Sequence, residues 1–172
     1  MSQPKIAPQV IAELNRQLNQ ELSAAHSYHA LSLWCADENL IGFASFFAKQ
    51  SAEEREHAEK IADHLLDRDS CPKLDAITAP KQNFKSLLDV AQQARAMEQA
   101  NTQGINAVYE AAVAAKDYPA QVLMHWFIGE QVEEEAWCIE MVQRVQGASC
   151  AGGLSDLDRH IEKYLGAGGD QK

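Results

Sequence analysis

A chain of 172 residues is long enough for one domain with a hydrophobic core and too short for two ordinary domains, so we expect residues 1–172 to form a single domain. Hydrophobic residues make up 46% of the chain, which excludes a disordered protein, and the net charge of −10 argues against a nucleic-acid partner. We find no membrane span, no signal peptide and no C-x-x-C pair among the four cysteines, and therefore expect a cytoplasmic protein with reduced thiols.

Four long stretches with apolar residues three and four apart predict four amphipathic helices. The first covers residues 8–36 and the second 40–68, with a break at residues 37–39. The third covers residues 84–116 and the fourth 119–147, with a break at residues 117–119. A last short helix is predicted from Ser155 to Leu165, with Ser155 as its N-cap and GAGG at residues 166–169 as its frayed end.

The link between the second and third helices, residues 69–83, has two prolines and no helical period. A helix of about 28 residues is roughly 42 Å long, and an extended segment of about 15 residues reaches at most about 50 Å. The link can therefore run the length of a bundle and make the second and third helices parallel. The sequence predicts an all-α four-helix bundle with one long crossover and a short C-terminal fifth helix.

Polar residues interrupt the apolar stripe of every long helix. In chain order these residues are Glu21, then Glu54 and His57, then Glu98 and Asn101, then Gln131 and Glu134. Each helix thus directs one carboxylate toward the same core, and each carboxylate lies within about two residues of the middle of its predicted helix. We expect the four carboxylates to meet at one level of the bundle.

Four buried acids at one level require positive partners, because neighbouring carboxylates repel one another. A structural bundle in which buried bases pair with the acids is one alternative, but the stripes carry no Lys or Arg opposite them. Two divalent cations would balance the four carboxylates, with His57 neutral. The pattern therefore favours a centre for two metal ions.

The chain resembles a bacterial non-haem ferritin from end to end, through the segments NQELSAAHSY, AEEREHAEK, AMEQA and WFIGEQVEEE. The resemblance implies that one iron is bound by Glu21, Glu54 and His57. It also implies that Glu54 bridges to a second iron held by Glu98 and Glu134. Gln131 stands where the family has a glutamine at its ferroxidase site, and a third iron site falls on Glu53, Glu130 and Glu133, with Glu134 shared. From the residues alone, Glu53, Glu130 and Glu133 are equally well explained as a solvated acidic face.

Two aromatic residues also match the family. Tyr28 lies two turns after Glu21 on the same face, where the family has a tyrosine that acts as an electron donor near the site, and Trp126 matches a second aromatic position. From the residues alone, both are equally well explained by core packing with a hydrogen-bonded polar tip. For the other histidines we expect solvent-facing or capping roles; they are His26, His29, His64, His125 and His160.

The chain differs from two related families, the bacterioferritins and the rubrerythrins, at positions that bind haem or metal in those families. Arg55 follows the helix-two glutamate where bacterioferritins have their haem-ligating methionine, so we expect no haem. Gln131 and Glu134 replace a second E-x-x-H, and the C-x-x-C iron module of rubrerythrins is absent. The resemblance implies a ferroxidase that oxidises ferrous iron with dioxygen and stores the ferric mineral in a hollow shell of 24 copies. The alternative is a non-storage di-iron or di-manganese oxidoreductase of the same superfamily.

Overall fold

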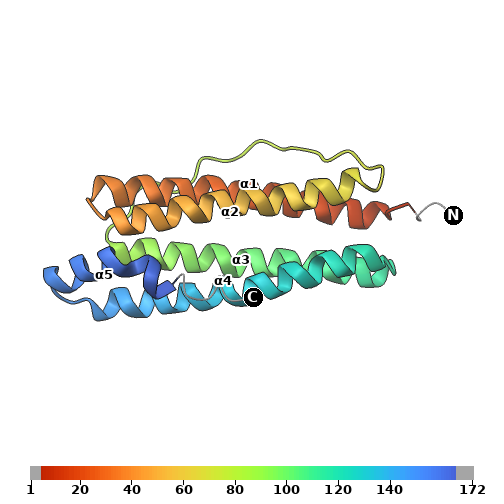
Figure 1. Ribbon diagram of the computed structural model, residues 1–172. Coiled ribbons are helices and arrows are strands. Elements are labelled where there is room, and N and C mark those ends of the chain that lie inside the picture. Colours follow the sequence, from red (N-terminus) through yellow and green to blue (C-terminus); the bar gives the residue numbers. More distant parts are fainter. Residues whose placement is uncertain (1–4, 166–172) are drawn as a thin grey trace.

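The computed structural model describes residues 5–165, which form five α-helices and, over that range, no strand. The helices α1 (Pro8–Asp37), α2 (Ile41–Leu66), α3 (Leu87–Ala114) and α4 (Tyr118–Gly147) form a bundle, and α5 (Ala151–Leu165) lies against one end of it (Figure 1). The predicted fold class is confirmed. None of these helices is long and apolar enough to cross a membrane.

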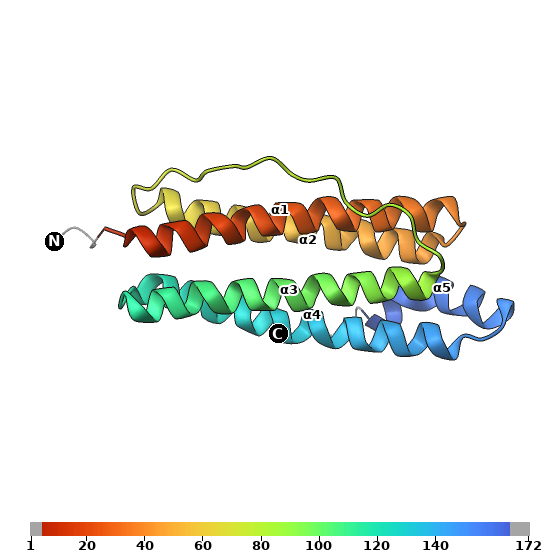
Figure 2. The ribbon, with the colours of Figure 1, turned by 180° about the vertical axis from the view of Figure 1, so that it is seen from behind.

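The crossover between α2 and α3 runs along the bundle, so α2 and α3 are parallel (Figure 2). Two asparagines of α1, one helical turn apart, hold it in place. The side-chain oxygen of Asn15 accepts the N–H of Lys73 at 2.7 Å, and that of Asn19 accepts the N–H of Asp75 at 2.8 Å. The amide nitrogen of Asn19 also donates to the carbonyl of Lys73 at 2.8 Å. These side chains satisfy backbone groups of a segment that has no secondary structure of its own.

The helix ends follow the turn chemistry of the sequence at most positions. Asn39 and Lys116, with φ of 59° and 53°, take the left-handed conformation between α1 and α2 and between α3 and α4. Ser86 caps α3 by accepting the N–H of Asp89, and this cap starts the helix at Leu87, later than predicted. Asp117 caps α4 by accepting the N–H of Ala120 at 3.1 Å.

The predicted start of the last helix was wrong. The helix α5 begins at Ala151, so Ser155 lies inside it and is not its N-cap. The helix extends back to Ala151 through the glycines at residues 152 and 153, because Leu154, Leu157 and Ile161 all contact the core of the bundle. The predicted frayed end at residues 166–169 lies outside the described residues.

The helix α5 docks on α2 through a close backbone approach. Leu157 and Ile161 are buried, and the side chain of Asp158 accepts the N–H of Phe43 at 3.0 Å, near the start of α2, where no side chain of α2 itself provides a cap. A Cβ atom on Gly42 would lie 1.8 Å from the carbonyl oxygen of Asp158. Only glycine therefore permits the two helices to come this close.

The core of the bundle consists of two hydrophobic clusters. The first contains Phe43, Phe47 and Met141 and includes the contact with α5, and the second contains Leu14, Ile61 and Ile105. Buried polar side chains from all four long helices complete the interior: Gln17, Glu21, Glu54, His57, Glu98, Asn101, Gln131 and Glu134. These residues define a polar layer at the middle of the helices, and this layer contains the candidate site.

Candidate metal centre

Each long helix contributes one glutamate to the polar layer. The exposed fractions are 0% for Glu21, 1% for Glu54, 1% for Glu98 and 6% for Glu134, and His57 follows Glu54 by one turn at 7%. The helical period explains the arrangement, because each of these residues replaces an apolar residue on the inward face of its helix. The structure therefore brings together the carboxylates and the imidazole that the sequence singled out.

Glu21, Glu54 and His57 form a preassembled set of metal ligands. Each offers one ligand atom, and these atoms lie within 4.8 Å of one another. The Nδ1 atom of His57 is 3.2 Å from a carboxylate oxygen of Glu54. Within residues 5–165, no other group of three His, Cys, Asp or Glu side chains is this close. Two carboxylates and one imidazole are a suitable donor set for a divalent first-row metal.

Glu98 and Glu134 lie in the same layer, and each is held by its own hydrogen-bond donors. The hydroxyl of Tyr28 and the amide of Gln131, the latter at 3.1 Å, donate to the two carboxylate oxygens of Glu98. The indole N–H of Trp137 donates to Glu134 at 2.5 Å. Gln131, which we predicted as a site residue, therefore contacts the carboxylate of Glu98.

Burial dominates the electrostatics of these acids. Burial raises the pKa of Glu54 well above its usual value, and the nearby charges of Glu21 and Glu98 raise it further. Burial, aided by Glu98, raises the pKa of Glu134 to about 8. The pKa of Glu98 is also raised by burial, although the donors Tyr28 and Gln131 oppose the shift. Some of these carboxyls therefore hold protons near neutral pH, and a cation that binds them would displace those protons.

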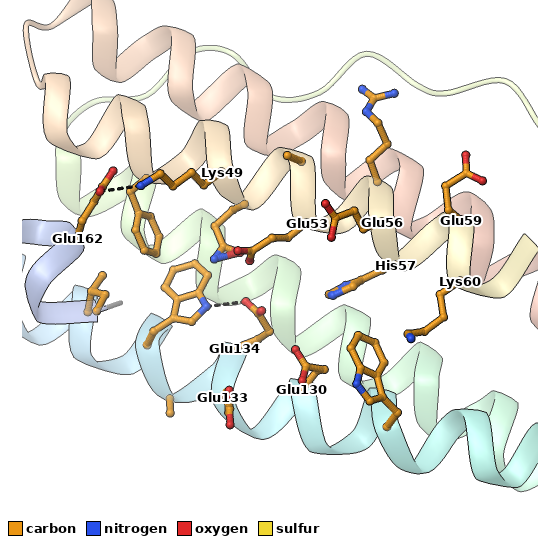
Figure 3. Close-up of a pocket in the computed structure, with 18 of the residues that line it drawn as sticks. Lys49, Glu53, Glu56, His57, Glu59, Lys60, Glu130, Glu133, Glu134 and Glu162 are labelled. Carbon is orange, nitrogen blue, oxygen red and sulfur yellow. Dashed lines mark hydrogen bonds and ion pairs between the residues drawn. The ribbon is translucent and has the colours of Figure 1, made fainter. Parts of the chain in front are cut away.

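A pocket of about 1440 Å³ opens beside the polar layer, between α2 and α4, and α5 contributes to its wall. Glu53 and His57 on α2 face Glu130 and Glu134 on α4 across this pocket (Figure 3). Glu53 and Glu133 are exposed and Glu130 is half-buried. The three residues predicted as a third iron site thus line an acidic wall without forming a tight ligand group, and the third site stays a prediction.

The two aromatic residues predicted near the site occupy different environments. Tyr28 is fully buried, stacks on Phe47 and donates its hydroxyl proton to Glu98. Trp126 is 39% exposed at the pocket, stands edge-on to His57 with ring centroids 5.5 Å apart, and has the Lys60 ammonium 4.3 Å from its ring centroid. Core packing therefore describes the ring of Tyr28 but not Trp126.

The remaining histidines lie outside the ligand group. His26, His29 and His125 are exposed, and His64 and His160 are half-buried. The ring of His160 contacts the carbonyl oxygen of Asp156 within its own helix at 3.0 Å. The exposure of His26, His29 and His125 agrees with the solvent-facing role expected from the sequence, whereas His64 and His160 are half-buried on their helices.

Sequence reasoning did not single out Gln17 or Trp137, which also hold these carboxylates. Gln17 and Trp137 each lie one turn from a site glutamate on the same helix, a spacing that marks them as neighbours of the site. Asn101 was visible as a polar interruption of the third stripe, but its partner lies on another helix.

Comparisons with known proteins agree with this geometry. A protein-family model described as a ferritin-like domain matches residues 11–148. The chain is 41% identical over 131 residues to a bacterial non-heme ferritin of Staphylococcus epidermidis, covering 76% of this chain and 79% of that protein. It is 36% identical over 158 residues to a bacterial non-heme ferritin of Campylobacter jejuni, covering 91% and 95%. Among solved structures, an open pore ferritin from the hyperthermophilic archaeon Archaeoglobus fulgidus superposes with a TM-score of 0.88 at 28% identity, covering 91% of this chain and 98% of that one.

Proposed function

We propose, because this chain belongs to the ferritin family, that it oxidises ferrous iron with dioxygen and stores the ferric product as an oxyhydroxide mineral. The observation that carries the proposal is the buried set of Glu21, Glu54 and His57, whose ligand atoms lie within 4.8 Å of one another. Carboxylates with one imidazole suit ferrous iron, and hard oxygen ligands favour the ferric product even more. Iron is thus the substrate and the cargo of the protein.

We propose the following role for each ligand in the polar layer. One ferrous ion binds to Glu21, Glu54 and His57. A second binds to Glu98 and Glu134, with Gln131 beside Glu98, and Glu54 bridges the two ions. Bridged metal ions in such sites lie about 3.5 to 4 Å apart, so one dioxygen molecule can take an electron from each. The protons displaced from the buried carboxyls are then available to the reduced oxygen.

Tyr28 is the residue best placed to supply a further electron. It is fully buried beside the proposed second iron, and its hydroxyl donates to Glu98. When the ring of Tyr28 gives an electron to the partly reduced dioxygen at the irons, its hydroxyl proton moves along this hydrogen bond to the carboxylate of Glu98. Such a transfer leaves no net charge on the ring inside the core.

The ferric product leaves through the pocket between α2 and α4. Its wall carries Glu53, Glu130 and Glu133, which we propose as the third iron site. A wall lined by carboxylates raises the local concentration of cations and gives a hydrolysed ferric product oxygen ligands on its way out.

Storage requires a hollow shell, and we propose 24 copies of the chain in the cytoplasm. Such a shell of 19.0 kDa chains has a mass of roughly 460 kDa. A particle of that size that retains many irons per chain after aerobic loading supports storage. A monomer or dimer that retains only two irons per chain favours the alternative, a non-storage di-iron or di-manganese oxidoreductase. Size exclusion combined with iron counting per particle distinguishes the two functions.

Replacement of Glu54 tests the oxidation chemistry. In the Glu54→Ala variant both irons lose a ligand, so we expect the fast phase of ferrous oxidation to disappear in stopped-flow measurements under excess dioxygen. Glu110→Ala, which removes an exposed carboxylate on α3 away from the pocket, is the matched control and should keep the initial rate. An unchanged initial rate in Glu54→Ala would contradict the proposal.

A further inference from the structure

Two buried amides hold the carboxylate of Glu21. Gln17 Nε2 donates to one oxygen of Glu21 at 2.8 Å, and Asn101 Nδ2 donates to the other at 3.0 Å. The same Gln17 nitrogen donates to Asn101 Oδ1 at 2.6 Å, which joins α1 to α3 through the three side chains. Gln17 and Glu21 are 0% exposed and Asn101 is 1% exposed.

The orientation of both amides is determined by their partners. Both contacts join an amide nitrogen, which only donates, to a carboxylate oxygen of Glu21, which accepts. The outward oxygen of Gln17 then faces the guanidinium of Arg16 at 3.5 Å. Each carboxylate oxygen that accepts one amide hydrogen bond still has a lone pair for a metal ion. The amides therefore restrict the rotation of Glu21 without occupying its capacity as a ligand.

Contacts further out immobilise Gln17 itself. Arg16 donates to the carbonyl of Gly104 at 2.8 Å and so joins α1 to α3 beside the amide. A Cβ atom on Gly104 would lie 2.2 Å from the side-chain oxygen of Gln17, so the missing side chain of this glycine provides the space for the amide. Residues on two helices thus support one carboxylate.

We propose that Gln17 and Asn101 are positioning residues that preform the first iron position by fixing Glu21, and that they set its metal affinity separately from that of the second position. This inference rests on the proposed function. The second position has its own donors, Gln131 for Glu98 and Trp137 for Glu134. Residues that hold a metal ligand in this way change metal affinity by about 10- to 100-fold when they are removed.

The test uses Zn²⁺, which binds without redox chemistry, and the assembled protein. Crystals of the wild type and of Asn101→Leu are soaked at a series of Zn²⁺ concentrations, and anomalous scattering gives the occupancy of each position. We expect Asn101→Leu to weaken the Glu21 position by about 10- to 100-fold and to leave the second position unchanged. Trp137→Phe, which removes the donor to Glu134, should give the opposite pattern.

Three outcomes bear on the inference in different ways. Equal weakening of both positions, or no weakening at the Glu21 position, overturns it. If Asn101→Leu does not assemble, Gln17→Met removes the other amide with little change in size. A second measurement needs no variant: the orientation of the Glu21 carboxylate is compared in wild-type crystals with and without Zn²⁺. A carboxylate that rotates when Zn²⁺ binds also overturns the inference. Wild-type crystals that bind no pair of Zn²⁺ ions contradict the proposed function instead.

Discussion

Replacement of Gly42 by alanine should release α5 from the bundle. The new Cβ would lie 1.8 Å from the carbonyl oxygen and 2.8 Å from the carbonyl carbon of Asp158, and both of these are backbone atoms. No rotation of a side chain can relieve this overlap, so α5 must retreat by more than an ångström. The retreat breaks the hydrogen bond from the Phe43 N–H to Asp158 and withdraws Leu157 and Ile161 from the core.

The free energy that holds α5 on the bundle can be estimated from the groups that α5 buries. Complete burial of a leucine or isoleucine contributes about 1.5 to 3 kcal/mol, and a capping hydrogen bond about 1 kcal/mol. Leu157, Ile161 and Asp158 together therefore account for about 4 to 7 kcal/mol, an upper limit because a released helix still hides part of its surface. If Gly42→Ala removes half of that energy, the equilibrium constant for release of α5 from the bundle rises by roughly 30- to 400-fold, at about 1.36 kcal/mol per factor of ten.

Amide hydrogen exchange of peptides from residues 151–165 measures this directly, because the exchange rate reports how often the helix opens. We expect exchange in Gly42→Ala to accelerate by at least 30-fold over the wild type. Gly129→Ala is the control: its Cβ would have no atom within 4 Å, and alanine should stabilise α4 by about 0.5 to 1 kcal/mol without affecting α5. Wild-type exchange rates for α5 in Gly42→Ala would refute the argument from close approach.

Three further predictions concern the ends of the bundle and the chemistry of the site. Asp117 pairs with Arg68 at 2.7 Å, so Asp117→Ala should cost about 3 kcal/mol and lower Tm at pH 7 by about 6 to 12 °C in calorimetry. Burial alone would raise the pKa of Asp117, but the hydrogen bonds from Arg68 and the Ala120 N–H lower it below the usual value near 3.9. The stabilisation is therefore complete only well above that usual value, and it is lost as the pH falls through the folded pKa. A difference in Tm between variant and wild type that does not narrow in acid would contradict this. In Tyr28→Phe, rapid-freeze electron paramagnetic resonance after mixing with dioxygen should show no tyrosyl radical, whereas the wild type should show one; an identical signal in both would exclude Tyr28 as the donor. Glu130→Ala should keep the first fast oxidation phase and slow the turnover of later iron additions, and an unaffected series of additions would argue against the third site.

The inward-facing polar residues could be predicted because the helical period reports which residues share a face. Glu21, Glu54 and Glu98 were each visible as a charged residue in an apolar stripe, and one carboxylate per helix is a pattern that a single sequence reveals. The residues that hold these carboxylates were harder to predict. The contact between Gln17 and Asn101 spans 84 positions along the chain and depends on how α1 packs against α3.

Two other differences between the sequence-based predictions and the structure also arise from packing between helices. The start of α5 was placed too late because Ser155 was interpreted as its N-cap, whereas the contacts of Leu154 and Leu157 with the bundle extend the helix back to Ala151. The exposure of Trp126 at the pocket depends on the separation of α2 and α4, which periodicity along one helix does not report. Tertiary packing decides both cases.

The polar layer also has a mechanical consequence. It lies between the two hydrophobic clusters, so that apolar packing is interrupted at the middle of the helices. A cation bound at Glu21, Glu54 and His57 would connect α1 to α2 where apolar packing is interrupted. Such binding stabilises the native state in proportion to the logarithm of the cation concentration. Under the proposed function, bound ferrous ions would therefore also hold the middle of the bundle together, and the stability of the bundle should rise with the concentration of free ferrous ion.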